Sequence, residues 1–132
     1  MYKKILVFTL ITMTLLTGCS CSKKTNDEKK DNYTVNEGVL EEKKVGNLEI
    51  YDINMKLQDE TSTFTIFFKN TSDKSMEIKK INLYFKDKNG KILITKKLDY
   101  YSSIEADEVQ SIVVLIEKNL SDAVSVDYEL AD

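Results

Sequence analysis

The sequence predicts an all-β protein, a small antiparallel β-sandwich of about six or seven strands within residues 45–132. Three observations predict this fold. Apolar side chains recur at every second position in several runs, turn-forming residues separate these runs, and no window beyond the amino-terminal apolar segment shows helical apolar spacing. With 132 residues, the chain has room for one small domain.

The expected strands follow one another from residue 48 onward. Alternating or continuous apolar side chains define them at residues 48–57, 64–68, 81–86, 109–117 and 124–130. In the first of these, the apolar phase changes partway along the run, which predicts a β-bulge at Tyr51–Asp52. Residues 109–117 are apolar on both faces, so we expect this strand to be central in its sheet.

Turn residues occupy the gaps between these runs. Asp87-Lys88-Asn89-Gly90 predicts a hairpin, because Asn-Gly tolerates the positive φ angles of a type I′ turn. Asn70-Thr71-Ser72-Asp73 offers side-chain oxygens that stabilise a turn, and Asp59-Glu60 separates the first two strands.

The amino terminus carries a targeting pattern. Lys3 and Lys4 give it a positive start, and an apolar run of 12 residues follows at 5–16, which is shorter than the ~20 residues of a spanning helix. The stretch Leu16-Thr17-Gly18-Cys19 then resembles the lipobox of bacterial lipoproteins. The resemblance implies that residues 1–18 are a signal peptide and that Cys19 is lipidated, so that the protein is anchored in a membrane without spanning it.

Between Cys19 and the expected domain lies a highly charged segment. Residues 20–44 contain many Lys, Asp and Glu side chains and few apolar ones, so they predict a disordered tether. The expected organisation is therefore a signal peptide at 1–18, the lipidated cysteine and tether at 19–44, and the domain at 45–132. Cys21 has no other partner in the chain once Cys19 is modified, which predicts a free thiol.

Part of the domain resembles a group of surface domains. The run from Phe64 to Ser72, the run from Ile81 to Asp87, and Asn89-Gly90 together resemble the Ig-like domains of Gram-positive lipoproteins, the FxLYD and telokin-like kinds. Ile104-Glu105-Ala106-Asp107 stands where that group has a Pro-Gly turn. The resemblance implies an Ig-like sandwich at the cell surface, and it implies no catalytic or ligand-binding residue.

The composition excludes several kinds of chemistry. The chain has no His, so imidazole metal sites and catalytic triads are absent, and its net charge of −3 argues against nucleic-acid binding. Asp87-x-Asn89-Gly90 overlaps a calcium-loop pattern, but Phe85 and Lys96 occupy two of the positions that need oxygen ligands. We therefore expect no metal site, no cofactor and no enzymatic activity.

Charge is unevenly distributed along the domain. Residues 74–97 contain eight Lys and two acidic residues, whereas residues 99–132 contain one Lys and nine acidic residues. Either the basic segment binds an anionic polymer or headgroup, or it pairs with the acidic segment across strands. Under the first explanation the contact surface consists of Lys79, Lys80, Lys86, Lys91, Tyr100 and Tyr101. Of the two tyrosines, one must face outward if both lie in a strand.

Two functions remain open from the sequence. The first is a non-enzymatic interaction module on the outer side of the cell membrane, which binds an envelope protein or an anionic wall polymer and is monomeric. The alternative is a lipoprotein that senses or captures a small solute or a cation at the acidic residues 105–108. A plain structural spacer without a ligand is a third explanation.

Overall fold

The alternating pattern continues through nearly the whole described part of the chain. The computed structural model describes residues 33–132, and their elements follow in the order η2 (Glu37–Val39), β1 (Lys43–Val45), β2 (Leu48–Leu57), β3 (Ser62–Asn70), β4 (Met76–Lys86), β5 (Ile92–Ile104), β6 (Val109–Ile116) and β7 (Ser125–Ala131). Element η2 is a short 3₁₀ turn, and within these residues no helix is long and apolar enough to cross a membrane. The expected signal peptide, Cys19 and Cys21 lie outside the described residues.

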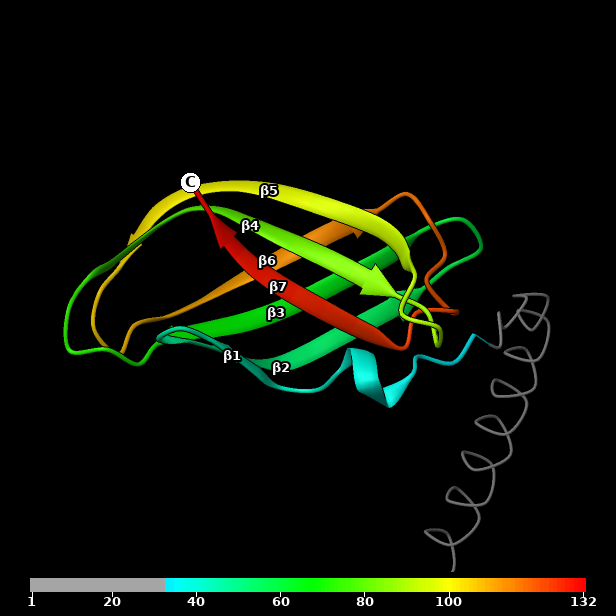
Figure 1. Cartoon of the computed structure of the whole chain (residues 1–132), viewed down its shortest axis with the longest axis horizontal. Helices are drawn as coiled ribbons and strands as arrows, with labels where there is room; N and C mark the ends of the chain where they lie inside the picture. The colour runs from blue at the N-terminus through cyan, green and yellow to red at the C-terminus, as the bar shows by residue number, and fades with distance from the viewer. Residues whose placement is uncertain (1–32) are drawn as a thin grey trace, which may run out of the picture. The chain divides into compact units, whose positions relative to one another are not determined.

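The strands form two antiparallel sheets that pack face to face (Figure 1). One sheet has the order β1-β2-β3-β6, and we call it sheet A; the other has the order β5-β4-β7, and we call it sheet B. Strand β5 lies against β6 at one side of the sandwich, and β1 lies against β7 at the other. The predicted all-β sandwich is therefore confirmed, with seven strands.

The inner faces of the two sheets form one apolar core. Strand β3 alternates strictly between buried and half-buried residues, as a strand with one face against a core must. The rings of Phe64 and Phe85 meet edge to face across the sandwich, 5.1 Å apart. Phe68 meets Tyr100 in the same way at 5.5 Å, so the aromatic side chains of β3 join it to both β4 and β5.

Asn70 fastens two turns at one end of the sandwich. Its buried side-chain amide donates to the carbonyls of Lys74 and Ile104, and its side-chain oxygen accepts from the amide and the hydroxyl of Ser72. Its backbone also pairs with Asp107 and Glu108. The turn chemistry predicted at residues 70–73 is present, and it holds the β5–β6 turn as well.

Ser62 does the equivalent work at the opposite end of β3. Its buried hydroxyl donates to the carbonyl of Lys118 at 2.7 Å and accepts from the amide of Leu120 at 3.0 Å. The connection from β6 to β7 is thereby fixed to sheet A before the chain crosses to sheet B.

The β-bulge is confirmed, whereas the type I′ turn is wrong. The register of β2 and β3 shifts between Tyr51 and Asn54, and Asp52 has a φ of 46°. In the β4–β5 hairpin only Gly90 has a positive φ, and the amide of Gly90 donates to the carbonyl of Asp87. The turn therefore resembles a type I turn followed by a left-handed glycine, which needs one such residue instead of two.

The strand at residues 109–117 is not central as expected. Strand β6 ends sheet A, and its outward side chains Val113 and Leu115 are exposed to 66% and 57%. An apolar outer face at an edge gives the same sequence pattern as a strand buried on both faces, so the pattern alone did not separate the two.

The packed unit also begins before the expected boundary at residue 45. Val39 is buried in the core, Val35 and Leu40 pack against it, and β1 pairs with β2. A few apolar residues among many charges are enough to fix residues 33–45, because the free edge of β2 offers them a strand to pair with.

Candidate functional site

The predicted lysine surface is divided between the two ends of β4. Lys79 and Lys80 lie near the beginning of this strand and Lys86 at its end, so Lys80 and Lys86 are about 20 Å apart at ~3.3 Å per residue. Lys91 is exposed in the hairpin beyond Lys86. The structure therefore does not gather the four lysines into one patch.

Two of these lysines pair with acidic residues at the carboxyl end of the chain. The Lys86 amine lies 2.5 Å from the carboxylate of Asp127, and the Lys79 amine lies 3.6 Å from that of Asp132. Strand β4 lies between β5 and β7, so the basic segment and the acidic segment are neighbours in sheet B. This arrangement supports the cross-strand explanation of the charge asymmetry.

The two tyrosines of β5 face in opposite directions, as expected. Tyr100 is half-buried against Phe68, and burial raises the pKa of its hydroxyl. Tyr101 is 66% exposed and has a φ of 45° at the irregular register between β4 and β5. Tyr101 is therefore the one aromatic residue of the predicted surface that is available to a ligand.

Hydrogen bonds across sheet B set the charge state of its acidic residues. The hydrogen bond from Lys86 lowers the pKa of Asp127, and that from the hydroxyl of Tyr84 lowers the pKa of Glu129, with help from Asn82. On sheet B, carboxylates thus engage two of the predicted lysines, Lys79 and Lys86.

The outer face of sheet A is different in character. Strand β6 places Val109, Val113 and Leu115 there in an exposed row that also includes Ser111, and Val109 is 46% exposed. On the same face the rings of Tyr51 and Phe67 lie 6.3 Å apart on the paired strands β2 and β3. We call this surface the outer face of sheet A. Exposed apolar side chains that gather on one face of a monomer often belong to a binding surface.

A shallow hollow of about 290 Å³ lies at one end of this face. It is lined by Glu42, Glu49, Tyr51, Lys69 and Val109. The hollow offers a ring, an aliphatic side chain and charges of both signs within one depression. Such a combination of an apolar area with a polar rim is the usual composition of a protein-binding surface.

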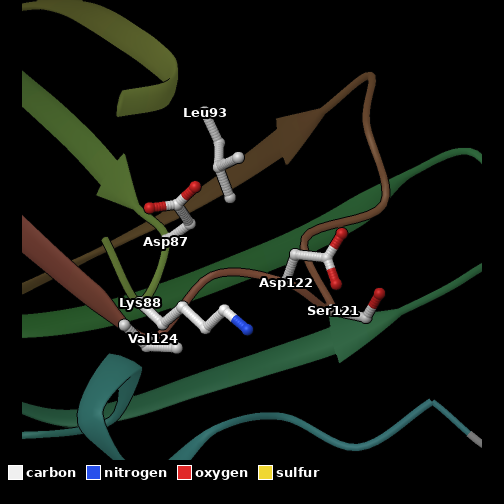
Figure 2. A pocket seen from close by; sticks show the side chains of 6 residues that line it. All are labelled: Asp87, Lys88, Leu93, Ser121, Asp122 and Val124. Carbon is white, nitrogen blue, oxygen red and sulfur yellow. The ribbon is translucent and has the colours of Figure 1, made fainter. Parts of the chain in front are cut away.

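A second hollow of about 350 Å³ lies between the β4–β5 hairpin and the β6–β7 connection (Figure 2). Its lining residues are Asp87, Lys88, Leu93, Ser121, Asp122 and Val124. The carboxylate of Asp87 already accepts hydrogen bonds from the amides of Asn89 and Lys91, so it stabilises the turn. Among the described residues no group of three Cys, Asp or Glu side chains is placed to hold a metal ion.

The acidic turn at residues 105–108 is likewise occupied by its own contacts. Glu108 accepts from the side chain of Gln110 and from the amide of Glu105, and these bonds lower its pKa. Asp107 forms an ion pair with Lys69 at 3.7 Å. The carboxylates of this turn fix the β5–β6 connection, and nothing in their geometry favours a cation.

Sequence reasoning missed the outer face of sheet A. The pattern at 109–117 predicted a central strand, Tyr51 was considered only as part of the β-bulge, and Phe67 only as a residue of the strand at 64–68. The available signal was the uncharged run at 109–116, which is unusual for an edge strand.

Comparison with known proteins gives one family. Residues 19–120 match the family model described as the SLAP domain. A crystal structure of a DUF1425 family member from Shewanella sp. pv-4 is similar to this chain at 10% identity and a TM-score of 0.43, with 75% of this chain and 94% of that chain covered. No curated protein matches the sequence.

Proposed function

The chain belongs to the SLAP domain family, and on that premise we propose that it is a lipid-anchored, non-enzymatic module that binds another protein at the outer surface of the cell membrane. The family indicates a surface-associated domain. The lipid anchor at Cys19 is supported by the lipobox-like stretch Leu16-Thr17-Gly18-Cys19.

The observation that carries the proposal is the outer face of sheet A. An apolar row, a pair of aromatic rings and a hollow with a polar rim adjoin one another there. In contrast, the lysines proposed for an anionic polymer are divided between two ends of a strand, and two of them are ion-paired. A protein partner therefore fits the surface better than a polyanion does.

The test is cross-linking in living cells with a tagged full-length chain, followed by mass spectrometry of the captured proteins. A Cys19→Ala chain serves as the control for anchoring. We expect one membrane or wall protein to be enriched with the anchored chain. Capture of the same protein at the same level by the Cys19→Ala chain would overturn the anchored part of the proposal.

Two tyrosine variants locate the binding surface. Tyr51→Ser removes the ring beside the hollow on sheet A, and Tyr101→Ser removes an exposed ring of the same type on sheet B. We expect Tyr51→Ser to reduce capture at least several-fold and Tyr101→Ser to leave it unchanged. The opposite result would assign binding to the lysine and tyrosine surface predicted from the sequence.

A further inference from the structure

Strand β6 is an unprotected edge. It is the last strand of sheet A, and its eight residues, Val109–Ile116, include no charged side chain. An edge strand presents unpaired backbone N–H and C=O groups, which pair readily with another strand unless charges, Pro or a bulge prevent it. In β6 none of these is present.

The other three edges of the sandwich are protected by charge. Strand β1 carries Lys43 and Lys44, β5 carries Lys96, Lys97 and Asp99, and β7 carries Asp127 and Glu129. Strands β1 and β7 lie against each other at one side of the sandwich, as β5 and β6 do at the other, so this contact does not distinguish the edges. The contrast in charge among the four edge strands singles out β6 as the one suited to accept a further strand.

We propose that the strand added to β6 is the β6 of a second copy of this chain. In a two-fold symmetric pair the strand runs antiparallel to its own copy, so every side chain near the axis meets one from the same set. A charged residue there would meet its own charge, which is unfavourable. The uncharged sequence of β6 satisfies this requirement along its full length.

One register centres the pair on Val113. In it Val113 faces its own copy, Ser111 lies opposite Leu115, and Ile112 lies opposite Val114. Every pair formed between residues 110 and 116 is then uncharged.

Pairing in this way joins two copies of sheet A into one continuous eight-stranded sheet. Its outer faces become a single surface, so the inference goes beyond the proposed function and does not compete with it. The protein is then a dimer in place of the monomer expected from the sequence.

The test uses full-length chains with two different epitope tags, expressed together in one cell. A photoreactive phenylalanine analogue replaces Ser111, which is exposed on β6. After irradiation we expect an adduct of twice the monomer mass that contains both tags. No adduct, or an adduct only with another protein, would overturn the proposal.

Three lysine variants identify the contact within that adduct. Val113→Lys places like charges at the axis and is expected to reduce the adduct at least tenfold. Thr95→Lys adds the same charge to the exposed face of β5, and Asn54→Lys adds it to the outer face of sheet A on β2, so both are expected to keep the adduct. An adduct that persists in Val113→Lys, or one that is lost in Asn54→Lys, would exclude pairing at the β6 edge. If Asn54→Lys keeps the adduct but no longer captures the partner protein, that result concerns the proposed function alone.

Discussion

At the scale of single residues, Asn70 is the polar side chain on which most of the turn structure depends. It makes four side-chain hydrogen bonds and is buried. We expect Asn70→Ala to lower the free energy of unfolding by about 2–3 kcal/mol, because two backbone carbonyls lose their donor in a buried place. Urea denaturation measures this free energy. The control is Asn36→Ala, which removes a cap at an exposed turn and should lower the free energy of unfolding by less than about 1 kcal/mol. Equal effects of the two substitutions would contradict the role given to Asn70.

For Tyr128 we expect a substitution to increase stability. Its hydroxyl is buried and has no hydrogen-bond partner among the described residues, and burial raises its pKa. Tyr128→Phe should therefore raise the free energy of unfolding by about 1 kcal/mol, since an unsatisfied polar group is removed. Tyr84→Phe is the matched control, because the hydroxyl of Tyr84 donates to Glu129, and this variant should be less stable than the wild type. A clear loss of stability in Tyr128→Phe would show that its hydroxyl has a partner.

The ion pair between Lys86 and Asp127 is tested by titration. The hydrogen bond from Lys86 is the main cause of the lowered pKa of Asp127, and Lys43 at 3.7 Å contributes less. In Lys86→Met we expect the pKa of Asp127 to rise toward its ordinary value, and in Lys43→Met to rise by a smaller amount. Carboxyl chemical shifts followed by NMR against pH give both values. The reverse order of the two variants would be inconsistent with the geometry.

At the scale of elements, the position of residues 33–45 depends on the close packing of Gly38 against the backbone of Val124. A Cβ atom at Gly38 would lie 2.2 Å from the carbonyl oxygen of Val124, which is too short for any contact. Gly38→Ala should therefore displace η2 and β1 while the two sheets remain paired. Hydrogen exchange should become faster in residues 36–45 and 123–126 and stay slow in β3 and β4. Faster exchange throughout the domain would mean that this segment holds the whole fold.

Elements also show what the sequence predicted and what it did not. Strands β3, β4 and β7 each bury one face, so their alternating pattern located them, and the shift of phase in β2 located its bulge. Strand β1 was missed because three residues, two of them Lys, carry no periodic signal, and its pairing depends on the edge of β2. The prediction that β6 is a central strand was wrong, because an apolar sequence does not distinguish a face that is buried within the domain from one that is exposed. The candidate surface was missed for the same reason, since strand pairing brings Tyr51, Phe67 and Val109 together.

At the scale of the whole molecule, lowered carboxyl pKa values make stability depend on pH. In the folded state Asp127, Glu129 and Glu108 have pKa values below their ordinary ones, so the folded protein binds fewer protons than the unfolded chain. The stability they provide is complete above the unfolded values of about 3.9 for Asp and 4.3 for Glu, and it is lost as the pH falls through the lower folded values. We expect the urea midpoint to be nearly constant from pH 7 to 5 and to fall below about pH 4. The triple variant Asp127→Asn, Glu129→Gln, Glu108→Gln should show a smaller fall, and an equal fall would assign the acid sensitivity to other groups.

The short pairing of β1 with β2 gives the domain a mechanical property. A pull from the amino-terminal side first acts on η2 and the buried Val39 and then reaches Lys43, the end of β1 farthest from the turn at Gly46. Strand β1 then separates from β2 one residue pair at a time instead of sliding along it as a unit. Residues 33–45 would then span at most about 45 Å in total, at roughly 3.4 Å per residue, while the pairings among the other six strands remain in place. Under tension residues 33–45 would detach and extend first, and the two sheets would separate only at a higher force.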